Sequence, residues 1–598
     1  MVSRSRMTRR TRRAVLAAAL MSLTMAIHAP ANAQQGEVRG SMAAHYGDAS
    51  SARPAIPAVL NEDDRDYYRQ VFAAIDAEEW DEATSLLEER EAGPLHQIAL
   101  AELYTHANSP RVSAEEIAQW FQYGSELPQA EQLSILGSRR GLDRIPSLPE
   151  AQRFSRQPGI TRRTRPRSID DGTISDRSRA AILDAIRTDD PQGALEILQD
   201  IDPELSDEAR AEWRQRVAWS FYIENDDVSS LALAQTVSEG SGAWVAEGEW
   251  VAGLASWRLG SCSDAADFFA RAARVSTNVE LTSAAHYWAH RALIRCREPG
   301  LAQQHLAAAA TYEETLYGLL ATDQLGINWP QSTRPTNFLS SDWNVVSNRQ
   351  NVRVATALVE IGRVALADEV LRHEVRIGNP RNYTSIAALA RELGLPSTQL
   401  FMAYNAPYGV RSDRQLRFPV ARWQPVTGWR VDPALAFAHA LQESSFRTAA
   451  VSPANARGLM QITPITVREH APRLNMRASY VDLNDPEVNL AFGQRNLEML
   501  RDSPVTGGLL PKIMAAYNAG LTPVERWNNE IRDFGDPLLW MESIPYWETR
   551  GYVAIVMRNY WMYERAAGIP SPSRRALAQG RWPEFPRRIS AATLSADW

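Results

Sequence analysis

The sequence is poor in lysine and in cysteine. Lys512 is the only lysine among its 64 basic residues, a bias that we attribute to codon usage rather than to function. Two cysteines in 598 residues are too few for a disulfide-rich scaffold, and they cannot build a cysteine-rich zinc site by themselves. The formal net charge of the whole chain is -7, which does not favour binding to nucleic acid, itself negatively charged. With 44% hydrophobic and 23% charged residues, the chain is neither disordered throughout nor collagen-like.

Long apolar runs are also scarce, apart from one near the start of the chain. Six arginines in residues 1–13 precede an apolar stretch over residues 14–27, and the small residues Ala31-Asn32-Ala33 follow. This three-part pattern predicts a secretory signal peptide, residues 1–33, cleaved after Ala33. A membrane anchor is the alternative, but the run contains polar residues and is shorter than the ~20 residues that a spanning helix needs. We therefore expect a soluble periplasmic protein that does not span a membrane.

Most of the remaining chain shows helical periodicity. Residues 34–58 are rich in small residues and proline, which predicts a flexible N-terminal segment. Residues 59–404 then contain one expected helix after another, in which an alanine recurs with a large apolar residue four positions on. This spacing puts both side chains on one helix face, as in stacked helical hairpins of the tetratricopeptide type. An ordinary helical bundle is the alternative. The pairs are Ala83/Leu87, Ala194/Leu198, Ala265/Phe269, Ala302/Leu306 and Ala367/Leu371.

Residues 139–178 interrupt this helical array. Between Arg139 and Arg167 lie nine arginines, four prolines and only two acidic residues. Such a segment cannot bury an apolar face, so we predict a solvated loop or linker. A basic patch for an anionic polymer is the alternative.

Prolines divide the last third of the chain into further segments. We expect a linker at residues 405–415, a compact helical domain at 416–566, and an extended tail at 567–598. The acidic cluster Asp482–Glu487 lies inside the compact domain. It lacks the glycine and the ligand spacing of an EF-hand loop, so we interpret it as helix capping rather than as a calcium site.

One helix of the compact domain carries a candidate acid. Asp432 suits an N-cap and Pro433 the first turn of a helix that is almost wholly apolar up to Glu443. Burial and the negative end of the helix dipole both raise the pKa of a carboxyl group. A carboxyl that stays protonated near neutral pH can act as a general acid in glycoside cleavage. A solvated glutamate at a helix end is the alternative that this segment leaves open.

Four motifs of this region occur together in a characteristic order. They are Asp432–Phe446, Ser452–Pro464, Ala515–Gly520 and Ile544–Val553. In this order and spacing they resemble the soluble lytic transglycosylases, strongly over residues 416–566 and more loosely over the helical region. The resemblance implies an all-α protein, in which a superhelical, tetratricopeptide-like ring domain precedes a catalytic domain like goose lysozyme.

The resemblance also implies roles for individual side chains. Glu443 would be the single catalytic acid and base, Ser444 would help to orient its carboxyl, and Tyr517 would hydrogen-bond close to it. Buried packing in a small helical domain is the alternative for each supporting residue. The other family positions, which would line the cleft, contact the sugar or brace the domain, are Met460, Gln461, Asn518, Glu548 and Tyr552.

The implied reaction is cleavage of the β-1,4 bond between MurNAc and GlcNAc in peptidoglycan glycan strands. It proceeds without water, leaves 1,6-anhydroMurNAc ends, and would start from strand ends if the ring restricts access. It needs no cofactor and no metal. The alternatives are a lysozyme-like or chitinase-like hydrolase on the same scaffold, and a periplasmic helical-repeat scaffold whose catalytic domain is degenerate.

The two cysteines are themselves informative. Cys262 and Cys296 lie 34 residues apart, about one helical hairpin, and in an oxidising compartment they could pair. Two buried free thiols are the alternative.

Overall fold

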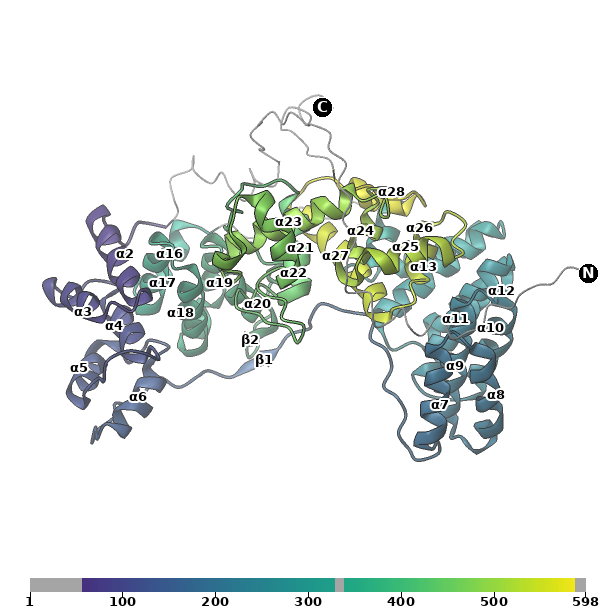
Figure 1. Ribbon diagram of the computed structural model, residues 1–598, viewed down its shortest axis with the longest axis horizontal. Helices are drawn as coiled ribbons and strands as arrows, with labels where there is room; N and C mark the ends of the chain where they lie inside the picture. Colours follow the sequence, from purple (N-terminus) through teal and green to yellow (C-terminus); the bar gives the residue numbers. More distant parts are fainter. Residues whose placement is uncertain (1–55, 328–337, 587–598) are drawn as a thin grey trace, which may run out of the picture. The chain divides into compact units, whose positions relative to one another are not determined.

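The computed structural model describes residues 56–327 and 338–586. The predicted signal peptide, most of the N-terminal segment and residues 587–598 lie outside this part. Apart from two short antiparallel strands, β1 (Phe154–Arg156) and β2 (Asn405–Pro407), the described elements are helices, which confirms the all-α class (Figure 1). None of the described helices combines the length and the apolar character needed to cross a bilayer.

The helices fall into a long N-terminal series and a shorter C-terminal series. The first comprises α2 (Glu62–Asp76), α3 (Trp80–Glu89), α4 (His96–Thr105), α5 (Ala114–Gly124), α6 (Ala130–Arg139), α7 (Asp176–Arg187), α8 (Pro191–Ile201), α9 (Asp207–Ile223), α10 (Asp227–Ala234), α11 (Trp244–Leu259), α12 (Cys262–Val275), α13 (Val279–Arg295), α14 (Pro299–Ala310), α15 (Leu316–Gln324), α16 (Ser340–Val346), α17 (Gln350–Glu360), α18 (Val364–Ile377), α19 (Tyr383–Glu392) and α20 (Pro396–Tyr404). The second comprises α21 (Pro433–Ser444), α22 (Pro464–His470), α23 (Pro486–Asp502), α24 (Leu510–Ala519), α25 (Leu521–Glu530), α26 (Pro537–Glu542), α27 (Trp547–Ala567) and α28 (Pro572–Ala578).

The first series packs as the alternation of small and large residues predicts. Both members of all five alanine pairs are buried, and α11, α12, α13 and α14 each pack on the next helix of the chain. Phe269 lies directly on α11, because a Cβ added at Gly253 would come within 2.5 Å of its ring. Small residues therefore let neighbouring helices approach closely, and large ones fill the space between them.

A disulfide joins the start of α12 to the residue that follows α13. Cys262 and Cys296 are bonded, with their Cα atoms 5.6 Å apart. This confirms the pairing and excludes the two free thiols. The bond closes a loop of about one hairpin in the middle of the helical series.

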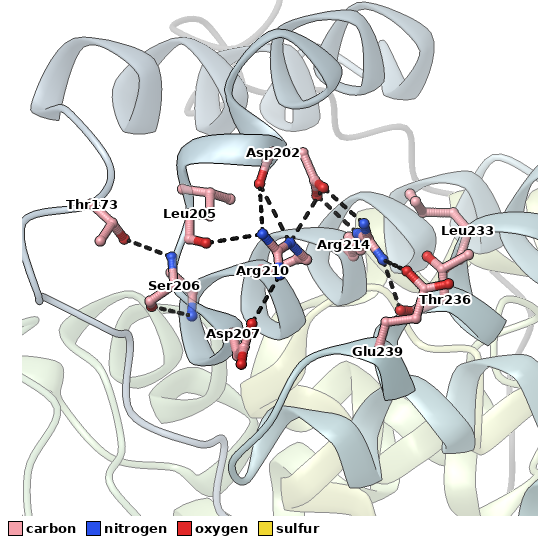
Figure 2. A network of polar contacts seen from close by, with 11 residues as sticks. Thr173, Asp202, Leu205, Ser206, Asp207, Arg210, Arg214, Leu233, Thr236 and Glu239 are labelled. Atoms are coloured by element: carbon pink, nitrogen blue, oxygen red, sulfur yellow. Dashed lines mark hydrogen bonds and ion pairs between the residues drawn. The ribbon is translucent and has the colours of Figure 1, made fainter.

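Charged side chains fix the turn between α8 and α9 (Figure 2). The carboxylate of Asp202 accepts two bonds from the Arg214 guanidinium, at 2.8 and 2.7 Å. Arg214 also donates to the carbonyl oxygen of Thr236 at 2.9 Å, and Arg210 pairs with Asp207 at 2.9 Å. Because the Asp202 carboxylate meets the Arg214 guanidinium through two bonds, this pair holds the turn in one geometry.

The arginine-rich segment is a loop over most of its length, as predicted, and many of its residues are exposed. It is not wholly solvated, because β1 within it pairs with β2 and Arg163 is mostly buried. The Arg163 guanidinium donates to Glu247 of α11 at 2.7 Å and to Glu542 of α26 at 3.1 Å. It also lies over the ring of Trp250, 4.7 Å from its centroid. The segment thus ties the two helical series together.

The predicted tail and linker also need correction. Residues 567–586 are not simply extended, because they contain α28, and Glu584 forms a bridge with Leu509. Phe585 is buried in the same core as the second helical series. The linker predicted at residues 405–415 begins within β2. Proline composition therefore located the breaks in the chain, but it did not reveal that these segments pack.

Removing the disulfide tests its contribution. A Cys262→Ser/Cys296→Ser double variant should lose about 3–4 kcal/mol of stability, as expected for closing a loop of this length. Thermal unfolding with and without reductant measures the effect. Reductant should lower the unfolding temperature of the wild type and leave the variant unchanged. Equal unfolding temperatures for oxidised and reduced wild type would contradict this prediction.

Candidate active site

The candidate acid lies at the end of a buried helix with a well-defined start and stop. Asp432 caps α21 by accepting a 2.9 Å bond from the amide of Ala434, which confirms the predicted start. The helix ends directly after Glu443, where Ser445 and Phe446 have φ values of +52° and +60°. Two successive non-glycine residues in this left-handed region carry backbone strain of a kind that gathers at functional sites.

The Glu443 carboxyl is largely buried, and it contacts a tyrosine hydroxyl and lies near a second carboxylate. Burial raises its pKa to about 7, a bond from Tyr552 opposes this rise, and the charge of Glu548 adds to it. The Tyr552 hydroxyl donates to Glu443 Oε1 at 2.6 Å. The predicted direction of the pKa shift is confirmed, and the solvated helix-end glutamate is excluded. At neutral pH both protonation states of Glu443 are therefore populated.

His439, which the motifs did not identify as a site residue, contacts the Tyr552 hydroxyl. His439 is fully buried, and its Nδ1 is 2.7 Å from the Tyr552 hydroxyl oxygen. Burial lowers its pKa to about 3, so the imidazole is neutral at physiological pH. His439 lies four residues before Glu443 on the same helix face. A polar residue at that spacing in an apolar helix is the signal that could have identified it.

Of the two candidate tyrosines, Tyr552 is the one that contacts the carboxyl. The Tyr517 hydroxyl donates instead to the carbonyl oxygen of Met460, at 2.8 Å. The Tyr517 ring stacks on Tyr552 with centroids 6.4 Å apart and lies 4.6 Å from the His439 ring. Tyr517 therefore packs the site, and its hydroxyl supports the loop that carries Met460.

Ser444 does not orient the carboxyl. Its side chain is buried, and its hydroxyl donates to the carbonyl oxygen of Ala440 at 3.2 Å, within its own helix. The sequence proximity of Ser444 to Glu443 is misleading, because adjacent residues on a helix point in different directions.

The loop over residues 450–462 is held by its own polar groups. Gln461, at φ +50°, donates its side-chain amide to the carbonyl oxygens of Ala450 and Gly458 at 3.2 and 3.0 Å. The amide of Met460 donates to Asn489 at 2.8 Å. Met460 is fully buried, so it and Gln461 fix the loop beside the site, and in this structure the Gln461 amide is engaged by that loop.

The remaining two predicted residues lie on or beside α27. Asn518 accepts a 2.6 Å bond from the Thr549 hydroxyl and so links α24 to α27. Glu548 is exposed at the start of α27, where its charge acts on Glu443. The structure thus brings Glu443, Tyr552 and Glu548 together, whereas Asn518 braces the helices that surround them.

The acidic cluster before α23 acts as a cap. Asp485 accepts bonds from the amides of Glu487 and Val488 at 2.8 and 3.2 Å. This confirms helix capping as the role of the cluster. Within residues 56–327 and 338–586, no group of three or more histidine, cysteine or acidic side chains is arranged to hold a metal ion.

The fold and the site together define an α-helical domain in which Glu443, a carboxyl of raised pKa, lies at the end of a buried helix. Residues 424–538 match the family model "Transglycosylase SLT domain". These residues therefore form a transglycosylase SLT domain, the kind of domain that the motifs predicted. Tyr552 lies beyond the matched residues.

Curated relatives share this part of the chain. The soluble lytic murein transglycosylase of Escherichia coli K12 is 33% identical over 171 residues, 28% of this chain and 26% of the relative. That of Salmonella typhimurium LT2 is 34% identical over 159 residues, 25% of this chain and 24% of the relative. The matched stretch spans about a quarter of the length of these relatives.

The likeness in fold extends further than the likeness in sequence. A solved complex of the 70-kDa soluble lytic transglycosylase with bulgecin A superposes with a TM-score of 0.55. The match covers 88% of this chain and all of the solved chain, at 17% sequence identity. At this identity the match concerns the fold alone, and it includes the helical series as well as the SLT domain.

Replacing Glu443 should stabilise the protein in a pH-dependent way. Because the fold raises its pKa from 4.5 to about 7, the folded state holds this proton more tightly than the unfolded chain. The resulting stability is fully present below pH about 4.5 and is lost as the pH rises through about 7. Glu443→Gln has no proton to lose, so its advantage in unfolding temperature over the wild type should be larger at pH 8 than at pH 5.

A glutamate away from the site provides the control. Glu525 is exposed on α25, and Glu525→Gln should leave the unfolding temperature nearly unchanged at both pH values. If the difference between Glu443→Gln and wild type were the same at pH 5 and pH 8, the raised pKa of Glu443 would be refuted.

Proposed function

We propose that the protein is a periplasmic lytic transglycosylase that cleaves the MurNAc–GlcNAc β-1,4 bond of peptidoglycan glycan strands. The observation that carries the proposal is Glu443, a carboxyl with a pKa of about 7 inside an SLT domain. The names of the curated relatives, soluble lytic murein transglycosylases, support the same substrate.

The reaction needs one group that first gives and then takes a proton. Glu443 protonates the glycosidic oxygen as the bond to the muramyl C1 breaks, which releases the GlcNAc alcohol. The Glu443 carboxylate then removes the proton of the muramyl C6 hydroxyl, whose oxygen bonds to C1 and closes the 1,6-anhydro ring. No water is consumed, and Glu443 ends in its starting state. The substrate's own N-acetyl oxygen can stabilise C1 between the two steps.

Hydrolysis on the same scaffold would require a second carboxyl. Retaining and inverting glycosidases place two carboxyls on either side of the bond. Glu548 is the acidic group whose charge acts on Glu443, and it is exposed at the start of α27. In the proposed reaction Glu548 tunes Glu443 but transfers no proton.

The masses of the products distinguish the two reactions. Digestion of peptidoglycan by the wild type should give anhydro products, each one water lighter than the hydrolytic product. Glu443→Gln should reduce cleavage by about 10²–10⁴-fold or more, because general acid and base catalysis are lost together. Glu548→Gln should keep the anhydro product and move the optimum to lower pH, because the charge that raises the Glu443 pKa is gone.

Three outcomes would contradict the proposal. Hydrated ends as the main product would indicate a hydrolase, as would loss of all cleavage in Glu548→Gln. Substantial cleavage by Glu443→Gln would remove Glu443 from the reaction. Glu525→Gln serves again as the matched control and should act like the wild type.

We also propose that the enzyme works from strand ends. Contacts between the two helical series support this, since Arg258 of α11 donates to Ser543 at 2.9 Å and Arg558 of α27 pairs with Glu280 of α13 at 2.9 Å. A helical region fixed to the catalytic domain would restrict the approach of cross-linked wall more than that of a free strand.

End-labelled glycan strands test the mode of action. The full-length enzyme should release small anhydro fragments from the earliest times, while the long strands shorten slowly. Early appearance of mid-length fragments would mean internal cutting. The role of the helical region would then have to be sought elsewhere.

A further inference from the structure

Three side chains form a continuous polar chain at the site. Glu443 Oε1 accepts from the Tyr552 hydroxyl at 2.6 Å, and the Tyr552 oxygen is 2.7 Å from His439 Nδ1. Two of the three belong to α21, four residues apart, and Tyr552 reaches them from α27. His439 is fully buried, and its bond to the site is to the Tyr552 hydroxyl, so it cannot touch a substrate.

Counting hydrogen atoms fixes the direction of these bonds. Tyr552 has one hydroxyl hydrogen, and an ionised Glu443 can only accept. If Tyr552 donates to Glu443, its oxygen must accept a hydrogen from His439, so Nδ1 carries the proton. The opposite tautomer would leave two acceptors competing for one hydrogen across contacts of 2.6 and 2.7 Å.

The other imidazole nitrogen agrees with this assignment. His439 Nε2 is buried and has no hydrogen-bond partner among the described residues. The imidazole is neutral, so a protonated Nδ1 leaves Nε2 without a hydrogen. An Nε2–H group at this position would be a buried donor with nothing to bind, whereas the bare nitrogen is an acceptor that only lacks a donor.

We propose that His439 is a positioning residue that holds the Tyr552 hydroxyl hydrogen on Glu443 Oε1 and thereby confines the transferable proton to Oε2. With Nδ1–H already donating to its oxygen, a Tyr552 hydroxyl that also accepted from Oε1 would leave its own hydrogen buried without an acceptor, so the reversed arrangement is disfavoured. Without the Nδ1–H donor, the hydroxyl can reverse, and a neutral Glu443 can direct its proton to Tyr552 instead of to the substrate. The activity readouts of this inference rest on the proposed function.

The groups that face Glu443 define what a variant should change. Tyr552 and Glu548 reach it from α27, Tyr517 approaches from α24, and His439 acts through Tyr552. The Tyr552 bond lowers the pKa of Glu443. Loosening that bond should therefore move the pH profile of kcat to higher pH.

Substituting His439 by Asn or by Gln distinguishes the role of Nδ1 from that of Nε2. The Asn amide nitrogen stands near the position of Nδ1, and the Gln amide nitrogen near that of Nε2. His439→Leu and His439→Gln should each lower kcat about tenfold or more with KM within about twofold, because only the proton's position changes. His439→Asn should recover most of kcat and the original pH profile.

A double-variant cycle tests whether His439 acts through Tyr552. In a Tyr552→Phe background, His439→Leu should cause no further loss of kcat. An equal loss in both backgrounds would overturn the inference. So would a His439→Leu enzyme with unchanged kcat and pH profile, or an Asn variant no more active than the Gln variant.

A measurement on the wild type covers the case in which the variants do not fold. Nitrogen NMR of histidine-labelled full-length protein reports the tautomer of each of its 10 histidines directly. The His439 resonances should be those of a neutral imidazole protonated on Nδ1 from pH 5 to pH 8. A neutral ring protonated on Nε2, or a ring that becomes cationic in this range, would overturn the inference. This result does not depend on activity, so it stands apart from a failure of the proposed reaction.

Discussion

The 2.6 Å bond between Tyr552 and Glu443 joins the last turn of α21 to α27, and the chemistry of the site depends on it. Burial raises the pKa of the carboxyl, and the tyrosine hydroxyl limits that rise, so the pKa is about 7. A higher value would leave a poor acid and a lower one a poor base. One carboxyl can serve in both steps because these opposing effects nearly centre it on neutral pH.

The position of α27 depends in turn on the helical series that precedes the catalytic domain. Arg558 of α27 is almost fully buried, and it pairs with Glu280 of α13 and donates to the carbonyl oxygen of Thr161. Arg163 bridges Glu247 and Glu542 on either side of this contact. Removing one partner from such pairs would leave a buried charge uncompensated, at a cost of about 3–5 kcal/mol. The helical region and the arginine-rich segment thus contribute to the geometry of the site.

Local features of the sequence were sufficient to predict several parts of this arrangement. The Asp432 cap and the apolar helix follow from residues 432–443, whereas the raised pKa of Glu443 was favoured over a solvated glutamate only when the later motifs were considered with this segment. The disulfide between Cys262 and Cys296 was predictable because a hairpin repeat separates the two cysteines.

Contacts between distant segments could not be predicted. Tyr552 lies 109 residues from Glu443 and 113 from His439, so the motifs placed a tyrosine near the carboxyl but did not show which hydroxyl bonds to it. Arginine content indicated solvation for a segment whose Arg163 finds acidic partners 84 and 379 residues away. Composition gives the charge of a side chain but not the partner that neutralises it.

In the proposed reaction Glu443 serves as both acid and base, and the muramyl C6 hydroxyl takes the place of water, so isotopic labelling of the solvent distinguishes it from hydrolysis. Peptidoglycan digested in water enriched in oxygen-18 would take up the label at C1 of the muramyl residue if water were the nucleophile. We expect the new ends to carry no oxygen-18, because the C6 oxygen of the substrate closes the ring. One oxygen-18 atom at each new end would contradict the proposed reaction.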